Sequence, residues 1–286
     1  RQPRMAKAAT ETAREAGTET VARPDGRTVC YATYGPADGR PVLCCHGTPG
    51  SRVFGELLVE DARAAGVRLL VPDRPGYGRS DHDPDRTPTS TARDLRAVLD
   101  HAGVETADVL AFSGGACYAL ALAEADRVAS LTLVSGAVPP SLSAGRPRQL
   151  RLLSAMAERT PRLLGAVLRG QRWLAGRRPS VVAAQYTNDD RSVSQEVTET
   201  VAAEFRTGLA SRAGAVHETR RLAAEWPVDV DDVSTPATLH HGSDDRNVPL
   251  AGAQALTERL PSGRLVVHEG ADHLGALLSC RGTIFE

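Results

Sequence analysis

The sequence predicts an α/β protein built on a mostly parallel sheet. Short runs rich in Val, Leu and Cys alternate with longer segments of helical periodicity, a pattern typical of strand–helix units around such a sheet. Runs such as VRLLVP (67–72) are continuously apolar, as expected for strands that are covered on both faces. The length of 286 residues fits one large domain, and a hydrophobic content of 41% supplies a sizeable core.

Eight strands account for the apolar runs. They are predicted at 19–23, 27–34, 41–45, 67–72, 107–112, 128–134, 237–241 and 264–268. Segments with helical spacing lie between them, at 52–66, 88–102, 114–126 and 250–260. In the helix over 88–102, Leu95, Val98 and Leu99 form an apolar stripe at positions i, i+3 and i+4. Residues 1–16 are polar and lack the apolar segment of a secretory signal, so we expect an N-terminal tail before a domain that spans 17–286.

Residues 141–236 interrupt the strand–helix alternation. They contain no convincing strand, and amphipathic stretches occupy 149–159, 162–175 and 195–224. We therefore predict a helical insert that lies over the sheet as a cap.

Charge and cysteine content exclude several classes of protein. The 34 basic and 35 acidic residues give a net charge of −1, and the aromatic content is only 4%, so no nucleic-acid partner is expected. No apolar run is long enough to span a bilayer, so no membrane partner is expected either. The five cysteines form no CxxC pair, which favours reduced, buried thiols and a cytoplasmic location. The sequence leaves the oligomeric state open.

The segment ADVLAFSGGA (107–116) predicts a nucleophilic serine at Ser113. A strand runs into a tight turn at this serine, and a helix follows. The turn requires small residues at Ala111 and Gly115, because larger side chains two residues before and after the serine would collide. The hydroxyl is then held at a helix N-terminus, where main-chain N–H groups favour developing negative charge. A simple helix N-cap is the alternative role for Ser113.

A nucleophilic serine needs a base, and the base needs an acid that orients it. In this architecture an Asp or Glu and then a His follow the serine along the chain. HGSDDRNVP (241–249) comes after one late strand, and EGADHL (269–274) comes after the next. Because both loops lie at the carboxyl ends of parallel strands, we expect their acidic and imidazole groups to converge above Ser113.

An oxyanion hole requires two main-chain donors near the serine. The N–H of Gly114 directly follows the nucleophile, and HGTPG (46–50) lies in the loop after the third strand. We expect Thr48 to supply the second N–H, with Gly47 allowing close approach. Pro49 has no N–H to donate.

These motifs resemble the α/β-hydrolase superfamily, and the resemblance covers nearly the whole chain. It rests on HGTPGSR (46–52), DRPGYGRSD (73–81), AFSGGA (111–116), HGSDDRNVP (241–249) and GADH (270–273). The resemblance implies the α/β-hydrolase fold, with an eight-stranded, mostly parallel sheet, helices on both faces and a helical cap at about 141–236.

The resemblance also implies roles for individual residues. Ser113 would be the nucleophile, Asp245 the acid and His273 the base, with Thr48 and Gly114 as the oxyanion donors. Asp245 is preferred to Asp244 because the family's acid is the fifth residue of HGxxD. His46 is expected to brace the oxyanion loop from below. Ala111 departs from the commoner glycine of this motif, but it is small enough for the turn.

No metal site and no cofactor are expected. No two of the His, Asp or Glu residues adopt a recognised ligand spacing, and His240 and His241 would point to opposite faces of a strand. We interpret His240, His241 and His268 as packed, hydrogen-bonded groups.

The insert is expected to supply the walls of the substrate pocket. Because the chain has only two Trp and four Phe, the walls of the pocket should be aliphatic. Each residue named below could instead serve only in packing within the insert. The candidates are Leu152, Leu153, Met156, Leu163, Leu164, Val167, Leu168, Trp173 and Tyr186. Arginines also gather in the insert, and their entry into the pocket would instead indicate an anionic substrate. They are Arg146, Arg148, Arg151, Arg159, Arg162, Arg169, Arg172, Arg177 and Arg178.

These observations predict a cofactor-free serine hydrolase that cleaves a small to medium apolar ester or lactone through an acyl-enzyme. Hydrolysis of a C–C bond and proline-iminopeptidase-like amide cleavage are the alternative reactions. A small-molecule receptor that retains the three catalytic residues is the alternative outside enzymes. Serine at the turn argues against dehalogenase and epoxide hydrolase chemistry, which in this superfamily uses Asp there.

Overall fold

The computed structural model describes residues 17–124, 127–143, 145, 147–189 and 193–286. The predicted tail at 1–16 and Arg146 lie outside the described residues. One sheet of eight strands forms the centre, in the order β1-β2-β4-β3-β5-β6-β7-β8. The strands are β1 Gly17–Ala22, β2 Thr28–Tyr34, β3 Arg40–Cys45, β4 Val67–Pro72, β5 Ala107–Phe112, β6 Val128–Val134, β7 Ala237–Gly242 and β8 Gly263–His268.

The sheet is parallel from β4 to β8. The antiparallel pairs are β1 with β2 and β2 with β4, at one edge. The predicted fold class, a mostly parallel eight-stranded sheet with helices, is therefore confirmed. The carboxyl ends of β3, β5, β7 and β8 lie along one border of the sheet, which brings the loops that follow these strands together.

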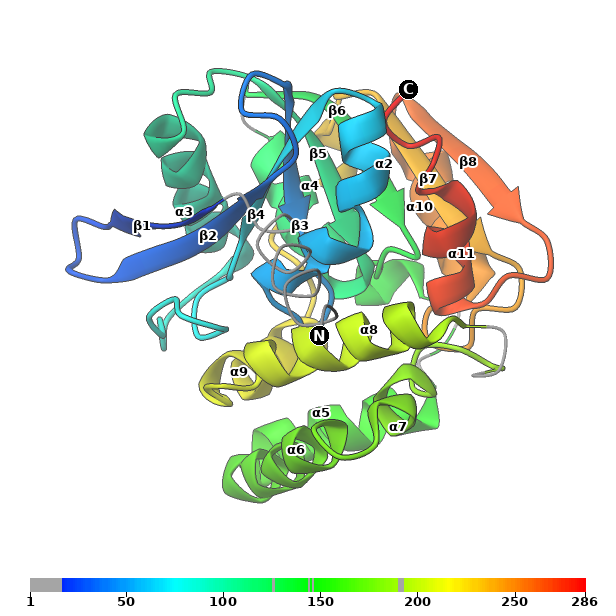
Figure 1. Ribbon diagram of the computed structural model, residues 1–286. Coiled ribbons are helices and arrows are strands. Elements are labelled where there is room, and N and C mark those ends of the chain that lie inside the picture. The colour runs from blue at the N-terminus through cyan, green and yellow to red at the C-terminus, as the bar shows by residue number, and fades with distance from the viewer. Residues whose placement is uncertain (1–16, 125–126, 144, 146, 190–192) are drawn as a thin grey trace, which may run out of the picture.

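Helices cover both faces of the sheet (Figure 1). Buried side chains of α3 (Pro88–His101), α4 (Ala116–Ala123) and α10 (Leu250–Arg259) belong to the hydrophobic core on one face. Those of η1 (Arg52–Leu57), α2 (Val59–Ala64) and α11 (His273–Cys280) belong to the core on the other face. The last helix, α11, begins at His273 and ends at Cys280, and residues 281–285 after it form turns. The five cysteines are all buried.

A helical insert, here defined as α5–α9, lies between β6 and β7. Figure 1 shows α8 and α9 next to the sheet domain, with α5, α6 and α7 on their outer side. The predicted amphipathic stretch at 195–224 is divided into two helices. The helices are α5 Arg148–Arg159, α6 Pro161–Ala175, α7 Pro179–Ala183, α8 Gln195–Gly208 and α9 Ala213–Arg221, and the single turns η3 Pro140–Leu142 and η5 Val230–Asp232 flank them.

Among the described residues, no helix is both long enough and apolar enough to cross a membrane.

Candidate active site

Ser113 lies on a strained turn directly after β5. Its φ is +52°, a left-handed backbone conformation that costs a residue with a side chain roughly 1–2 kcal/mol. The turn leaves no room for larger neighbours, since a Cβ on Gly115 would lie 2.3 Å from the Cys45 carbonyl oxygen. Ala111 is completely buried beneath the turn. The single turn η2 (Ser113–Gly115) then leads into α4, which places Ser113 at the start of a helical segment.

Asp245 and His273 form a buried pair at the carboxyl border of the sheet. The Nδ1 atom of His273 is 2.7 Å from Oδ2 of Asp245. The other carboxylate oxygen, Oδ1, accepts hydrogen bonds from the main-chain N–H groups of Asn247 and Val248, at 2.8 and 2.9 Å. Burial acts to raise the pKa of Asp245, but the attraction of His273 and these hydrogen bonds outweigh burial and hold the pKa below its usual value. Asp245 is thus an ionised acceptor that fixes the imidazole.

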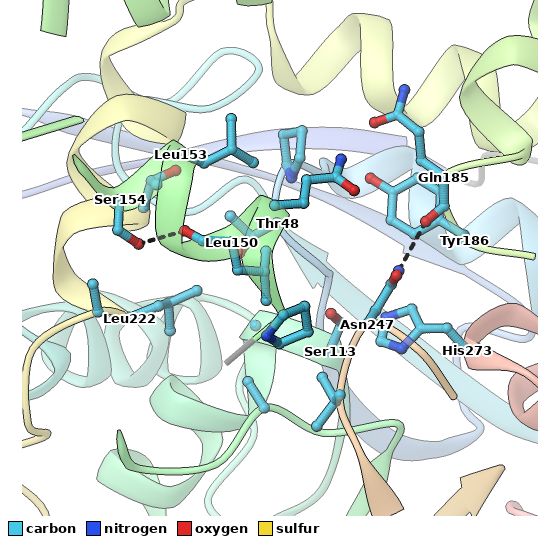
Figure 2. A pocket seen from close by; sticks show the side chains of 18 of the residues that line it. Thr48, Ser113, Leu150, Leu153, Ser154, Gln185, Tyr186, Leu222, Asn247 and His273 are labelled. Atoms are coloured by element: carbon cyan, nitrogen blue, oxygen red, sulfur yellow. Dashed lines mark hydrogen bonds between the residues drawn. The ribbon is translucent and has the colours of Figure 1, made fainter. Parts of the chain in front are cut away.

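The second imidazole nitrogen is available for chemistry. Nε2 of His273 is buried and makes no hydrogen bond to the described residues. His273 and Ser113 line the same cavity (Figure 2). Two rings confine the imidazole, with Phe112 tilted against it at 5.0 Å between ring centroids and Tyr186 stacked at 6.2 Å. The arrangement presents an unpaired basic nitrogen to the cavity that holds the serine.

The two other acidic residues of these loops have different partners. Asp244 is exposed, and its side chain accepts a hydrogen bond from the Ser243 hydroxyl. Asp272 caps α11 by accepting a hydrogen bond from the N–H of Gly275 at 2.7 Å. Its second oxygen binds the Thr187 hydroxyl of the insert at 2.6 Å. Neither carboxylate is paired with His273.

The insert is attached directly to the segments that carry Asp245 and His273. The Asn247 amide donates to the Gln185 carbonyl oxygen at 2.9 Å, a contact drawn in Figure 2. The N–H of Leu274 donates to the Tyr186 carbonyl oxygen at 2.8 Å. The segment after α7 is therefore held against both Asp245 and His273, a connection that the sequence analysis missed.

Thr48 lies beside Gly114, and its hydroxyl donates a hydrogen bond to Glu218 of α9. A Cβ on Gly114 would lie 2.3 Å from the Thr48 hydroxyl oxygen, so the two residues are in close contact. Arg74 and Arg86 each bind one oxygen of the Glu218 carboxylate at 2.5 Å, and all three side chains are buried. Burial raises the pKa of Glu218, but the two guanidinium groups lower it more strongly, to about 2. This buried ionic cluster connects the insert to the predicted oxyanion loop.

The same cluster holds the carbonyl groups of that loop. Arg74 donates to the carbonyl oxygens of His46 and Gly47, at 2.5 and 2.9 Å. Nδ1 of His46 donates to the Gly47 carbonyl oxygen at 2.8 Å. Its Nε2 accepts a hydrogen bond from the main-chain N–H of Arg74 at 3.4 Å. Burial and the nearby arginines hold the pKa of His46 well below its usual value, so this ring is a neutral brace. Arg74 belongs to the DRPGYGRSD motif, but no spacing in the sequence indicated Glu218 or Arg86.

A cavity of about 250 Å³ opens above Ser113. Thr48, Gly114 and His273 line its base, and side chains of the insert line its walls. The described wall residues include Leu150, Leu153, Leu164, Leu168, Gln171, Tyr186, Phe205, Thr219 and Leu222. Of the predicted wall residues, Leu153, Leu164, Leu168 and Tyr186 lie there, and Met156 does not.

Four predicted wall residues face outward instead. Leu152, Leu163, Val167 and Trp173 are exposed to solvent because they lie on the outer faces of α5 and α6. The eight described arginines of the predicted group, between Arg148 and Arg178, are also exposed, and Arg246 is the arginine that lines the described cavity. The walls are therefore largely apolar, and their polar residues are hydroxyl-bearing residues, glutamines, an asparagine and Arg246.

Comparisons with known proteins agree with this architecture. The family model described as alpha/beta hydrolase fold matches residues 40–279. A non-heme chloroperoxidase of Streptomyces lividans is 30% identical over 262 residues, which cover 89% of this chain and 92% of that protein. A 2-hydroxy-6-oxononadienedioate/2-hydroxy-6-oxononatrienedioate hydrolase of Cupriavidus pinatubonensis is 26% identical and covers 91% of this chain and 90% of its own length. The structure of a thermophilic esterase from Thermogutta terrifontis superposes with a TM-score of 0.72 at 23% identity, over 94% of this chain and 97% of that one. The chain therefore belongs to the α/β-hydrolase family of enzymes.

Proposed function

We propose that this protein is a cofactor-free serine hydrolase that cleaves a carboxylic ester or lactone through an acyl-enzyme. The observation that supports this most strongly is the state of His273, which is bound to Asp245 through Nδ1 and leaves Nε2 unpaired in the cavity of Ser113. A base oriented in this way can take the proton of a serine hydroxyl.

The reaction would proceed in two stages. In the first stage, Ser113 attacks the substrate carbonyl carbon as its proton moves to Nε2 of His273. The N–H groups of Gly114 and Thr48 stabilise the oxyanion, and the proton passes to the leaving alkoxide as the C–O bond breaks. In the second stage, water gives a proton to His273 and attacks the acyl group, and Ser113 regains its proton as the acid is released.

The cavity favours a small to medium apolar acyl compound. Its volume of about 250 Å³ is modest, and aliphatic side chains such as Leu153, Leu164 and Leu168 form much of its wall. The arginines of the insert lie outside it, so they supply no site for an anionic group. We assign the insert α5–α9 the role of a cap that defines the size of the substrate.

A reducing compartment suits the thiols of this chain. Cys30, Cys44, Cys45, Cys117 and Cys280 are all buried, and burial raises the pKa of Cys45 and Cys280 to about 12. Burial of this kind favours the protonated, reduced thiol. We therefore place the protein in the cytoplasm.

C–C bond hydrolysis is the second candidate, because the Cupriavidus relative is named for the hydrolysis of a dienedioate. Comparison of p-nitrophenyl acetate, butyrate and octanoate with a vinylogous 1,5-diketone as substrates would separate the two reactions.

We expect turnover of the esters, and Ser113→Ala should lower kcat by a factor of at least about 10³. Multiple turnovers also distinguish an enzyme from a receptor. Ester cleavage that is unchanged in Ser113→Ala would refute the serine mechanism.

A further inference from the structure

A second group of reactive side chains lies outside the catalytic cavity. His240 of β7, His268 of β8 and Cys280 of α11 converge, and one ligand atom from each lies within 4.8 Å of the other two. Nδ1 of His240 and Nε2 of His268 are 3.1 Å apart, and the two rings are stacked with an interplanar angle of 25°. The proposed hydrolytic reaction uses none of these three residues.

The topology explains why the three side chains meet. In the register of the parallel strands, His240 pairs with Val266 and Gly242 pairs with His268. The two histidines therefore lie on the same face of neighbouring strands, two positions apart. The apolar residues of α11 pack on this face, and Cys280 is the last residue of that helix. His241 faces the other way and binds the Val248 carbonyl oxygen at 2.8 Å. Because each potential ligand comes from a different element, no local sequence spacing indicates the group.

The chemistry of the group matches a thiophilic metal ion. Two imidazole nitrogens and one thiolate are a ligand set that zinc uses, with Zn–N distances of about 2.0–2.1 Å and a Zn–S distance of about 2.3 Å. In a tetrahedral site these bond lengths place two nitrogens roughly 3.4 Å apart and a nitrogen and a sulfur roughly 3.6 Å apart. The observed 3.1 Å between the imidazole nitrogens is already close to the first value. The sulfur lies within 4.8 Å of both nitrogens, so it would have to approach them by at most about 1.2 Å to reach the second value.

We propose that His240, His268 and Cys280 bind one zinc ion, with water in the fourth coordination position. Binding would replace the imidazole–imidazole hydrogen bond with two Zn–N bonds, the proton of that bond moving to the other nitrogen of its own ring through the solvent. The thiol would lose its proton to the solvent as the Zn–S bond forms. This proposal replaces the expectation from the sequence that no metal is bound.

The position of the site suggests what the ion would do. β7 leads into the loop of Asp245, and β8 leads into the loop before His273, which is the first residue of α11. An ion held by β7, β8 and α11 would connect the elements that carry both residues. Since it binds the folded chain, zinc would raise the midpoint of thermal unfolding. Because it lies outside the cavity of Ser113, the ion would take no part in the proposed hydrolysis.

The test uses the untagged full chain and zinc chloride alone. Isothermal titration calorimetry is expected to show one zinc ion per chain. His268→Gln should weaken binding roughly tenfold or more, while the matched variant His82→Gln, which alters an exposed histidine elsewhere, should bind as the wild type does. With Co²⁺ in place of zinc, the wild type should show a near-ultraviolet thiolate-to-cobalt absorption band that Cys280→Ser lacks.

Two outcomes would overturn the proposal. One is wild-type zinc affinity no greater than that of His268→Gln, and the other is a cobalt complex without a thiolate band. Circular dichroism shows whether each variant is folded. If Cys280→Ser does not fold, the zinc affinity of His268→Gln still tests the proposal. The His268 side chain is only partly buried, so its replacement should leave the chain folded. None of these readouts depends on ester hydrolysis, so the metal site and the proposed function succeed or fail separately.

Discussion

The hydroxyl of Thr48 donates a hydrogen bond to the carboxylate of Glu218, 170 residues later in the chain. This bond joins the predicted oxyanion loop to helix α9 of the insert. Arg74 and Arg86 neutralise the carboxylate from two sides, so its charge is compensated although it is buried. The insert therefore does more than enclose the cavity, because it also holds Thr48, whose main-chain N–H we propose as an oxyanion donor.

Removal of the Glu218 charge should damage both stability and catalysis. Glu218→Gln leaves two buried guanidinium groups without an anion, and we expect a loss of about 3–5 kcal/mol in the free energy of unfolding. Among molecules that remain folded, kcat should fall while KM changes little, because the displaced Thr48 N–H acts in the transition state. Urea unfolding and ester kinetics measure the two effects. Glu225→Gln, at an exposed carboxylate, is the control, and equal behaviour of the two variants would contradict the role of Glu218.

The buried carboxyl of Glu204 should make stability depend on pH. Burial raises its pKa from 4.5 to about 8, so the folded chain holds a proton that the unfolded chain releases above pH 4.5. Its contribution to stability is then present below pH 4.5 and lost as the pH rises to 8. Relative to the wild type, Glu204→Gln should become more stable over this interval.

Unfolding titrations at pH 5, 6, 7 and 8 check this prediction. Glu199→Gln, on the exposed side of the same helix, should show no such trend. A stability difference between Glu204→Gln and the wild type that stays constant with pH would show that Glu204 is ionised in the folded chain.

The two neighbouring aspartates should differ sharply in their effect on catalysis. Asp245→Asn removes the anion that orients His273, and we expect kcat to fall by about 10⁴. Asp244→Asn should leave kcat within about threefold of the wild-type value, because the exposed Asp244 side chain has no contact with the imidazole of His273. Steady-state ester hydrolysis at pH 8 compares them. A larger loss in Asp244→Asn would reassign the acid.

Glycine is required at Gly115, in the turn after Ser113, but it is not required at Gly165 in the insert. In Gly115→Ala, the new methyl group would meet the carbonyl oxygens of Cys45 and His46 at 2.3 and 2.7 Å, so the turn should distort and activity should be lost. At Gly165 of α6, a Cβ meets nothing within 4 Å, and alanine should stabilise the helix by about 0.5–1 kcal/mol. Thermal unfolding and ester kinetics of both variants test this contrast. Full activity in Gly115→Ala would contradict the observed packing.

The sequence predicted those features that depend on local pattern. The eight strands could be recognised because their apolar runs are short and separate, and the turn at Ser113 because its small residues lie two positions away. The insert was harder, since its amphipathic stripes do not reveal which neighbour each face meets. Leu164 and Leu168 line the cavity, whereas Leu163 and Trp173 on the same helix are exposed.

Contacts between distant segments escaped prediction for a different reason. Arg74 and Glu218 are 144 residues apart, and Arg86 and Glu218 are 132 residues apart. Charged residues at such separations give no sign of their partners until the fold places them together. The same holds for His240, His268 and Cys280, whose proximity follows from strand register and from the packing of α11.

Labelling with a fluorophosphonate tests the central claim most directly. The wild-type chain should gain one phosphonyl group, and peptide mass spectrometry should locate it on Ser113. Labelling should disappear in Ser113→Ala and fall strongly in His273→Ala, while Ser262→Ala, at an exposed turn, should label as the wild type does. A label on another residue, or undiminished labelling of Ser113→Ala, would contradict the assignment of Ser113 as the nucleophile.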